Sequence, residues 1–407
     1  MKMNPRIINI ISRPYSSIRR SAVEDVFIVG HARTPLGSFQ GQLQSLSATR
    51  LGSIAIENAI KATGIDKSAI EEVYMGCVVQ SGLGQAPARQ AALGAGLSNT
   101  TPCATVNKVC ASALKAITMA TAQLAVGHRN VMIAGGMESL SNSPFLLERG
   151  STPYGGINLK DSCSFDALTD AYSGWHMGKC AENTAEKLNI SKDDQDDYGI
   201  LSYRRTEKAI EDGVFHGEIY PLEVRKGKIT TIVTTDEEVS RNDYETFRET
   251  KLYWGKTVAV GSSSKLADGA TATILANETG LKMHNLKPLA RVIAYSDSAV
   301  NPVDWPVAPA KGIQDLLNRA GMKKEDISKW EINEAFAVVV LANARILDLN
   351  LEDVNVHGGA ISVGHPFGMS GGRITNHLVH TLNSGEFGVA SLCNGGGGAG
   401  SILVQKL

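Results

Sequence analysis

Cys110 is the first residue whose setting suggests chemistry. It follows Asn107, Lys108 and Val109 and precedes a stretch whose periodicity predicts a helix over 112–126. A thiol at a helix N-terminus faces unpaired N–H groups and the positive end of the helix dipole, which lowers its pKa. The pattern therefore predicts a nucleophilic thiolate at Cys110, although a buried structural cysteine would give the same local sequence.

A histidine held between glycine and proline is the second candidate. His365 lies in a glycine-rich run from Gly358 to Arg373, where missing side chains let a ligand approach the backbone closely. Histidine is the natural proton acceptor for a cysteine nucleophile. The alternative is that His365 only caps the helix predicted over 371–382.

A third group of candidates lies at strand ends. Cys393 ends a predicted strand, and the N–H groups of the glycines from Gly395 to Gly398 could form an oxyanion hole. Asn333 and Glu334 stand at another strand-to-helix junction, where polar residues indicate either a site or an ordinary helix cap. Two thiols and a histidine in such settings favour acyl transfer through a covalent intermediate.

Strands and helices must alternate to position these residues. The pattern predicts a strand over 26–29, a helix over 48–62 closed by Gly64, a strand over 72–75 and a helix over 85–97. Such alternation predicts an α/β layered fold with buried sheets. A helix followed by glycine, a strand and a glycine turn occurs twice, over 112–136 and 371–398, which indicates an internal duplication.

The duplication predicts two halves, 23–285 and 286–407. Between the repeated segments, residues 139–258 are more polar, as expected for an inserted loop domain that covers a site. Within it, Ser191 and Asp194 form a plausible helix capping box.

The first 22 residues differ in kind from the rest. They contain arginines, serines and isoleucines but no acidic residue before Glu24, which is typical of a mitochondrial transit peptide. The alternative is a basic tail without a targeting role. The net charge of −1 gives no reason to expect nucleic-acid binding, and no apolar run is long enough to cross a membrane.

The number and spacing of the cysteines argue against a zinc site and against a disulfide framework. None of the six cysteines forms a CxxC pair, which argues against zinc, and six are few for a disulfide framework in 407 residues. We interpret Cys77, Cys103, Cys163 and Cys180 as buried apolar residues.

Taken together, the segments around Cys110, Asn333, His365 and Cys393 resemble the thiolase family in order and spacing, and the similarity covers 24–407. The resemblance implies two similar α/β halves in a five-layer α-β-α-β-α arrangement with an inserted loop domain. It implies reversible ping-pong condensation of two acetyl-CoA to acetoacetyl-CoA plus CoA, with no covalent cofactor. The short-chain mitochondrial branch fits best, which implies a matrix location and a homotetramer built as a dimer of dimers.

The resemblance also assigns roles. Cys110 would take the acyl group, His365 would accept its proton, Cys393 would handle the second proton, and Asn333 would hold a water. The N–H groups of Cys110 and Gly395 would form the oxyanion hole, and His357 is interpreted as structural. The acyl pocket and the coenzyme A contacts would use His176, Met177, Ser264, Tyr203, Arg241 and Asp243. A potassium ion would be held at Tyr203, Val260, Gly261, Ser263 and Ile361.

The sequence departs from the family pattern in a few places. Ser262 and Ala267 replace asparagines, and Thr246 stands where a lysine that contacts coenzyme A is common. Trp305 is bulkier than the usual phenylalanine, so cleavage of 2-methylacetoacetyl-CoA, a step of isoleucine degradation, is a hypothesis. Three alternatives stay open: a longer-chain thiolase of β-oxidation, a β-ketoacyl synthase, and a non-catalytic acyl-CoA carrier.

Overall fold

The computed structural model describes residues 23–150 and 154–407. The proposed transit peptide, residues 1–22, lies outside the described residues. Among the residues that are described, no helix is both long and apolar enough to cross a membrane.

Five strands of the first half lie in the order β4-β3-β5-β10-β1. Four strands of the second half lie in the order β12-β13-β14-β11. The bounds of the first set are β1 Val26–Arg33, β3 Glu72–Gly76, β4 Cys103–Val106, β5 Val131–Ser139 and β10 Ala267–Asn277. Those of the second set are β11 Ala290–Ala299, β12 Lys329–Ile332, β13 Phe387–Asn394 and β14 Gly398–Lys406.

The two sets of strands have the same topology, which agrees with the internal duplication. β3 runs parallel to both β4 and β5, and β12 runs parallel to β13, while the remaining pairs in each set are antiparallel. An isolated parallel bridge between Trp330 and Val354 stands where the first set has β4. The residue at which one half ends and the other begins stays a prediction.

The strands of the two halves also pair with each other. Val26, Phe27 and Ile28 of β1 pair antiparallel with Val292, Arg291 and Ala290 of β11. The two sets therefore form one continuous sheet.

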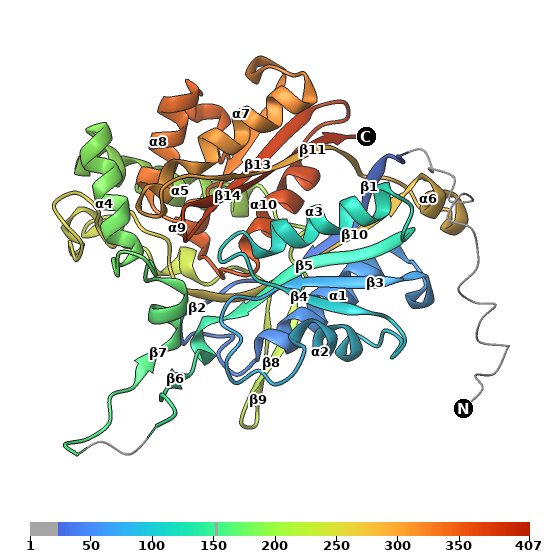
Figure 1. The fold of residues 1–407 in the computed structure, drawn as a ribbon, viewed down its shortest axis with the longest axis horizontal. Coiled ribbons are helices and arrows are strands. Elements are labelled where there is room, and N and C mark those ends of the chain that lie inside the picture. Colours follow the sequence, from blue (N-terminus) through green and yellow to red (C-terminus); the bar gives the residue numbers. More distant parts are fainter. Residues whose placement is uncertain (1–22, 151–153) are drawn as a thin grey trace, which may run out of the picture.

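Helices form three layers: one covers the outer face of each set of strands, and one lies between the two sets (Figure 1). The helices α1 (Ala48–Thr63) and α2 (Pro87–Gly94) cover the first set of strands. α3 (Ser112–Ala125) and α10 (Ser370–Thr381) lie between the two sets, in a core to which both contribute. α7 (Ala308–Ala320) and α8 (Ala337–Leu347) cover the second set. This is the expected five-layer α-β-α-β-α arrangement.

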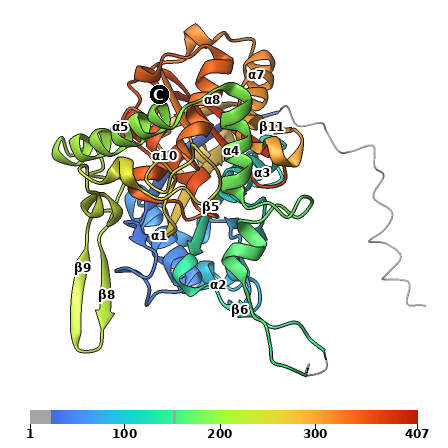
Figure 2. The same ribbon diagram turned by 90° about the vertical axis from the view of Figure 1, so that its left-hand side faces the viewer.

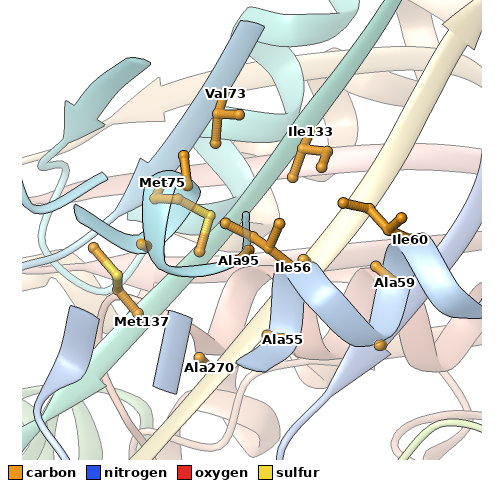
Figure 3. Packing of buried hydrophobic residues seen from close by; sticks show 14 of the residues in the cluster. Ala55, Ile56, Ala59, Ile60, Val73, Met75, Ala95, Ile133, Met137 and Ala270 are labelled. Atoms are coloured by element: carbon orange, nitrogen blue, oxygen red, sulfur yellow. The ribbon is translucent and has the colours of Figure 1, made fainter. Parts of the chain in front are cut away.

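The helix α1 shows how the sequence specifies a layer. Ser47 caps its start by accepting from the N–H of Arg50, and Gly64 ends it in a left-handed conformation (φ 68°). Its apolar face, including Ile56 and Ala59, packs on buried strand residues such as Ile133 (Figure 3). The predicted bounds of this helix were correct to within one residue.

Two predicted elements differ in extent. The strand expected over 26–29 runs on to Arg33, whose buried guanidinium pairs with Asp236 and Glu218 and keeps the chain in the sheet. The helix expected over 85–97 spans only Pro87–Gly94, because Ala86 adopts a left-handed conformation (φ 49°) that starts the helix abruptly.

The inserted segment carries the elements that lie outside the layers. They are β6 (Phe145–Leu146), β7 (Lys160–Asp161), α4 (Met177–Leu188), α5 (Lys192–Glu211), β8 (Leu222–Lys226) and β9 (Ile229–Val233). The predicted capping box of Ser191 and Asp194 is present at the start of α5. The β8–β9 hairpin and the segment around β6 project away from the layers (Figure 2). Three further short elements are β2 (Gly37–Ser38), α6 (Glu278–His284) and α9 (Ala360–Val363).

Candidate active site

A cavity of about 250 Å³ brings together half of the sequence-predicted site residues. Cys110 and His365 face it from the two halves of the fold. Other predicted residues in its wall are His176, Met177, Ser263, Ser264, Trp305 and Gly395. Residues from the start of α3, the start of α10, the insertion and the turn after β13 therefore converge on one small space.

Cys110 lies in a strained turn just before α3. Val109 adopts φ 47°, a left-handed conformation that is a genuine outlier for a β-branched residue. The turn is held by Asn107, whose Oδ1 accepts from the Val109 N–H, and by Ser112, whose Oγ accepts from the Lys108 N–H. Such strain persists only where surrounding bonds enforce it, and here it aims the thiol of Cys110 into the cavity.

The protonation state of Cys110 differs from the sequence prediction. Its sulfur accepts from the N–H groups of Gly395 and of Cys110 itself, and both bonds lower the thiol pKa. Burial acts in the opposite direction and is the larger effect, so the pKa rises to about 12. The prediction of a resting thiolate is therefore wrong: the helix α3 starts only at Ser112, and removal from water outweighs the N–H donors.

His365 is a neutral base with a defined tautomer. Its Nδ1 lies 2.6 Å from the Oγ of Ser370, and that hydroxyl donates to the carbonyl of Pro366 at 3.1 Å. Because the hydroxyl proton goes to Pro366, Ser370 accepts from Nδ1–H, and Nε2 carries the lone pair. Burial, assisted by the positive charge of Arg373, lowers the pKa of His365 to about 3. The helix α10 starts at Ser370 with Met369 as its N-cap, so His365 does not serve as a helix cap.

The two polar residues after β12 have different roles. Asn333 directs its Nδ2 to Nε2 of His365 at 3.4 Å, and its Oδ1 has no hydrogen-bond partner within the described chain. Glu334 turns away and accepts from Tyr198 Oη at 2.8 Å and Ser202 Oγ at 2.7 Å. Neither caps α8, which begins at Ala337 with Phe336 as its N-cap. Asn333 therefore contacts His365, and Glu334 anchors α5.

Cys393 lies near the end of β13 and does not line the cavity, although Asn394 and Gly395, which follow it, do. It is only 1% exposed, and burial raises its thiol pKa well above the usual value. The second cause of this pKa rise is the charge of Cys110, so the two sulfurs are close enough to interact electrostatically. Because like charges oppose each other, the two thiols do not ionise together.

Aromatic side chains form the remaining wall. His176 caps α4 through Nδ1, which accepts from the Gly178 N–H at 3.0 Å, and its ring stacks on Trp254 with centroids 5.1 Å apart. Phe336 lies edge-on to Trp254 at 5.8 Å and near Trp305 at 6.0 Å. This wall is apolar and crowded, as suits a short acyl chain.

Three residues near the cavity were missed by sequence reasoning. Ser370 orients His365, and Trp254 stacks on His176. The buried carboxylate of Glu138 accepts from the N–H groups of Val78, Val79 and Gly368, and so ties the loop after β3 to the turn after His365. Only the folded structure reveals these partners, because each lies far along the chain from the group it contacts or resembles an ordinary helix residue.

Three residues assigned to coenzyme A lie outside the cavity. Tyr203 is buried in α5, 1% exposed, with its ring edge-on to Phe247. Arg241 and Asp243 are exposed on the insertion, where Asp243 accepts from the Glu245 N–H and the Thr246 hydroxyl. Their contact with the nucleotide end of coenzyme A stays a prediction.

The potassium prediction does not fit this chain. Of the five expected positions, Val260, Gly261 and Ser263 direct their carbonyl oxygens to the ammonium of Lys265. The hydroxyl of Tyr203 is hydrogen-bonded to Glu238. A second cation at these carbonyls would meet the positive charge of Lys265 at contact distance. Among the described residues there is also no cluster of histidine, cysteine and carboxylate side chains that could hold a metal ion.

His357 lies outside the cavity, in agreement with its structural interpretation. Its Nδ1 is 3.0 Å from Nε2 of His377, whose Nδ1 is 2.7 Å from a carboxylate oxygen of Glu218. Of the cysteines set aside as structural, Cys77, Cys163 and Cys180 are buried and Cys103 is partly exposed, and none forms a disulfide.

Comparison with known proteins agrees with this geometry. Residues 26–279 match the model of the thiolase N-terminal domain, and residues 286–406 match that of the thiolase C-terminal domain. The chain is 52% identical over 404 residues to mitochondrial acetyl-CoA acetyltransferase from Rattus norvegicus, covering 98% of this chain and 95% of that protein.

Solved structures give the same result. The Acat5 thiolase from Ascaris suum in complex with coenzyme A superposes with a TM-score of 0.91 at 41% identity, covering 94% of this chain and all of that one. Human mitochondrial 3-ketoacyl-CoA thiolase superposes with a TM-score of 0.91 at 35% identity, covering 95% of this chain and all of that one. These matches exclude the β-ketoacyl synthase alternative, and the chain belongs to the thiolase family.

Proposed function

We propose that the protein is a short-chain acetyl-CoA acetyltransferase, which condenses two acetyl-CoA to acetoacetyl-CoA and CoA and catalyses the reverse thiolysis. The observation that carries this proposal is the pair of N–H groups, from Cys110 and Gly395, that converge on the Cys110 sulfur in a cavity shared with His365. An acyl group attached to this sulfur has its oxygen one bond further on, within reach of the same two N–H groups, and donors at that position stabilise the oxyanion of acyl transfer.

The first half-reaction forms an acyl-enzyme. Cys110 Sγ attacks the thioester carbon while Nε2 of His365 takes the thiol proton. The N–H groups of Cys110 and Gly395 hold the oxyanion until the carbon–sulfur bond to CoA breaks. The CoA thiolate takes the proton from His365 and leaves, so Cys110 is acetylated and His365 is neutral again.

The second half-reaction uses the other thiol. Acetylation removes the ionisable proton of Cys110, so the repulsion that raises the Cys393 pKa disappears. Neutral His365 takes the Cys393 thiol proton at Nε2, and the Cys393 thiolate then takes a proton from the methyl group of a second acetyl-CoA. The resulting carbanion attacks the acetyl carbon on Cys110. The new carbon–carbon bond gives acetoacetyl-CoA, and the Cys110 thiolate leaves and takes the proton held on Nε2 of His365, so that both thiols and the neutral imidazole are restored.

The enolate oxygen of this second substrate needs its own donors. Nε2 of His365, which now holds the Cys393 proton, faces the cavity and can donate to that oxygen. The Oδ1 of Asn333, which has no partner within the described chain, lies beside it and can hold a water. In thiolysis the same groups act in reverse, with Cys393 activating the thiol of CoA. Direction is then set by the concentrations of CoA and acetyl-CoA.

Two alternative functions fit the cavity less well. A longer-chain thiolase of β-oxidation would need room for an extended acyl chain, whereas the cavity here is about 250 Å³ and closed by Trp254, Trp305 and Phe336. A non-catalytic carrier would have no use for a neutral, oriented histidine beside a thiol with two N–H donors.

The experiment that decides between these functions is CoA-dependent cleavage of purified substrates by residues 23–407. We expect kcat/KM for acetoacetyl-CoA to exceed that for a 3-ketoacyl-CoA of ten or more carbons by at least about tenfold. A preference for the longer substrate would establish the β-oxidation alternative. Binding of coenzyme A without any cleavage would establish the carrier.

Trp305 is expected to limit branching at the α-carbon of the substrate. Its indole is 2% exposed and forms part of the cavity wall beside Phe336. We expect Trp305→Phe to raise kcat/KM for 2-methylacetoacetyl-CoA, relative to acetoacetyl-CoA, by about tenfold or more, since one methyl group is worth ~1–3 kcal/mol in a close-fitting pocket.

Trp330→Phe is the matched control, because Trp330 is equally buried but is not part of the cavity wall. The substrate ratio should not change in that variant. An unchanged ratio in Trp305→Phe as well would show that Trp305 does not set this preference.

Location and assembly follow from the same relatives. The basic, acid-free segment 1–22 and the relative named as mitochondrial support import into the matrix, which a fusion of residues 1–22 to a fluorescent protein would test.

Exposed apolar side chains on the projecting segment near β6, including Phe145, Leu147 and Ile157, support a homotetramer. A monomeric mass by light scattering would contradict it.

A further inference from the structure

A ring of backbone carbonyls beside the cavity surrounds a lysine ammonium. Nζ of Lys265 donates to the carbonyl oxygens of Val260 at 2.7 Å, Ser263 at 2.9 Å and Gly261 at 3.2 Å. An ammonium has three N–H donors and no acceptor, so these bonds use every donor it has. Neutral carbonyl oxygens that replace the water around a small cation are also how proteins hold free potassium.

The positive charge of Lys265 is held without a close carboxylate. All three bonds of its ammonium go to carbonyl groups, and the nearest influence of opposite sign is the carboxylate of Glu238, which raises the pKa of Lys265. Burial is the larger effect and lowers that pKa to about 8. The ammonium is therefore an internal cation stabilised mainly by dipoles, not a surface charge or half of a salt bridge.

The loop that surrounds this cation supports the reactive groups. The carbonyl of Lys265 accepts from the His365 N–H at 2.8 Å, and Leu266 forms a bridge with His365. One residue earlier, the Ser264 N–H donates to the carbonyl of Ala335, two residues after Asn333. The residues on either side of Lys265 thus bond to the segments that carry His365 and Asn333, while its side chain closes the loop on itself.

We propose that Lys265 is a tethered monovalent cation, whose ammonium fills the carbonyl ring of Val260, Gly261 and Ser263 in place of free potassium and so positions the loop behind His365. Lys265 is a positioning residue, because it acts through His365 and the cavity wall and not on the substrate. The chain consequently needs no free potassium at this place. This inference goes beyond the proposed function, and only its kinetic readout depends on acetoacetyl-CoA cleavage.

The test compares the parent chain with Lys265→Ala in potassium chloride and in tetramethylammonium chloride at equal ionic strength. For the parent we expect the same unfolding temperature and the same kcat/KM in both salts. Removing the ammonium leaves a carbonyl ring with space for an ion. We expect Lys265→Ala to lose about 10- to 100-fold in kcat/KM without potassium, and potassium to raise both its kcat/KM and its unfolding temperature in a saturable manner.

Two further variants separate the charge from the packing of the side chain. Lys265→Met keeps most of the chain length without a charge and leaves no room for an ion, so we expect it to be impaired and not restored by potassium. Lys67→Ala removes another ammonium that donates to a backbone carbonyl, that of Ala95, away from the cavity. It should behave as the parent does in both salts.

Each contrary result overturns the proposal. A specific effect of potassium on the unfolding temperature of the parent would mean that a free ion binds beside Lys265, and this arm needs no variant to fold. Full activity of Lys265→Ala without potassium would show that the cation does not position the loop. An impaired Lys265→Ala that ignores potassium, or equal rescue of Lys265→Met, would show that only packing matters. The unfolding measurements hold even if the protein does not cleave acetoacetyl-CoA.

Discussion

Replacement of Cys110 by alanine is expected to lower kcat for acetoacetyl-CoA cleavage by at least ~10⁴-fold, the scale seen when a covalent nucleophile is removed. Cys110 is the thiol that faces the cavity, and no acyl group can be held on the enzyme without it. The N–H groups of residue 110 and Gly395 remain in the variant, so any residual rate reports the oxyanion hole alone. The measurement is the rate of acetoacetyl-CoA loss with excess CoA, together with the mass of the protein after exposure to acetyl-CoA.

Cys103→Ala is the matched control for that experiment. Cys103 lies at the edge of the sheet in β4, is partly exposed and does not line the cavity. It should retain the parent rate and become acetylated normally. An acetyl adduct on the Cys110→Ala protein at the parent rate would place the nucleophile elsewhere.

His365→Asn is expected to lower the rate of the acylation step by ~10²–10⁴-fold, the usual contribution of a positioned general base. The asparagine keeps a hydrogen-bonding side chain near Ser370 but has no lone pair at the position of Nε2. Single-turnover acetylation of Cys110, followed by rapid quenching, measures this step directly. Acylation at the parent rate would show that His365 does not take the Cys110 proton.

The pH dependence gives a second test of His365. Burial disfavours the charged imidazolium, so the pKa falls from the ordinary 6.5 to about 3, and the base is already neutral at any pH above that value. The acylation rate should therefore show no break near pH 6.5, because no proton leaves His365 there. A break at that pH that is present in the parent and absent in His365→Asn would mean that the imidazole is charged in the resting protein.

Ser370 offers a milder variant on the same hydrogen-bond chain. Ser370→Ala removes the acceptor that holds Nδ1–H while leaving Nε2 in place. The rate should fall less than in His365→Asn, and Ser370→Thr should restore it. Failure of threonine to restore the rate would leave the tautomer assignment without support.

Local patterns predicted the elements of the fold well. The helix cap at Ser47, the glycine stop at Gly64 and the capping box at Ser191 each satisfy backbone groups within a few residues, so the sequence alone specifies them. The duplication was also visible as a repeated order of helix, glycine, strand and glycine turn. Pairing of β1 with β11 was not predicted, because hydrogen bonding between residues about 260 positions apart leaves no local signature.

The protonation state of Cys110 shows where reasoning from a local motif fails. Proximity to a helix start predicted a lowered pKa, and the N–H donors that act on the sulfur do lower it. The size of the opposing burial effect depends on residues from both halves that exclude water, and no pattern around Cys110 encodes their positions. The direction of the pKa shift was therefore wrong, while the choice of residue as the candidate nucleophile agrees with its place in the cavity.

The potassium prediction shows a related limit of reasoning from the sequence. Resemblance placed Val260, Gly261 and Ser263 at a cation site, and the structure does direct their carbonyls to a cation. That cation is the ammonium of Lys265, which lies two to five residues after the three carbonyl groups. A lysine in a loop usually points to solvent, so its position in the sequence gave no sign of this contact. Only the side-chain path into the carbonyl ring distinguishes an internal ammonium from an ordinary surface lysine.

The division of labour between the two thiols is tested most directly by the protein mass of Cys393→Ala after mixing with acetyl-CoA. With Cys393 absent, Cys110 still has His365 and both N–H donors. We therefore expect Cys110 to become acetylated stoichiometrically, with one acetyl group per protein chain. No acetoacetyl-CoA should form, because nothing removes the proton of the second acetyl-CoA. Steady formation of acetoacetyl-CoA by this variant, or a protein that is never acetylated at Cys110, would contradict the two-thiol mechanism.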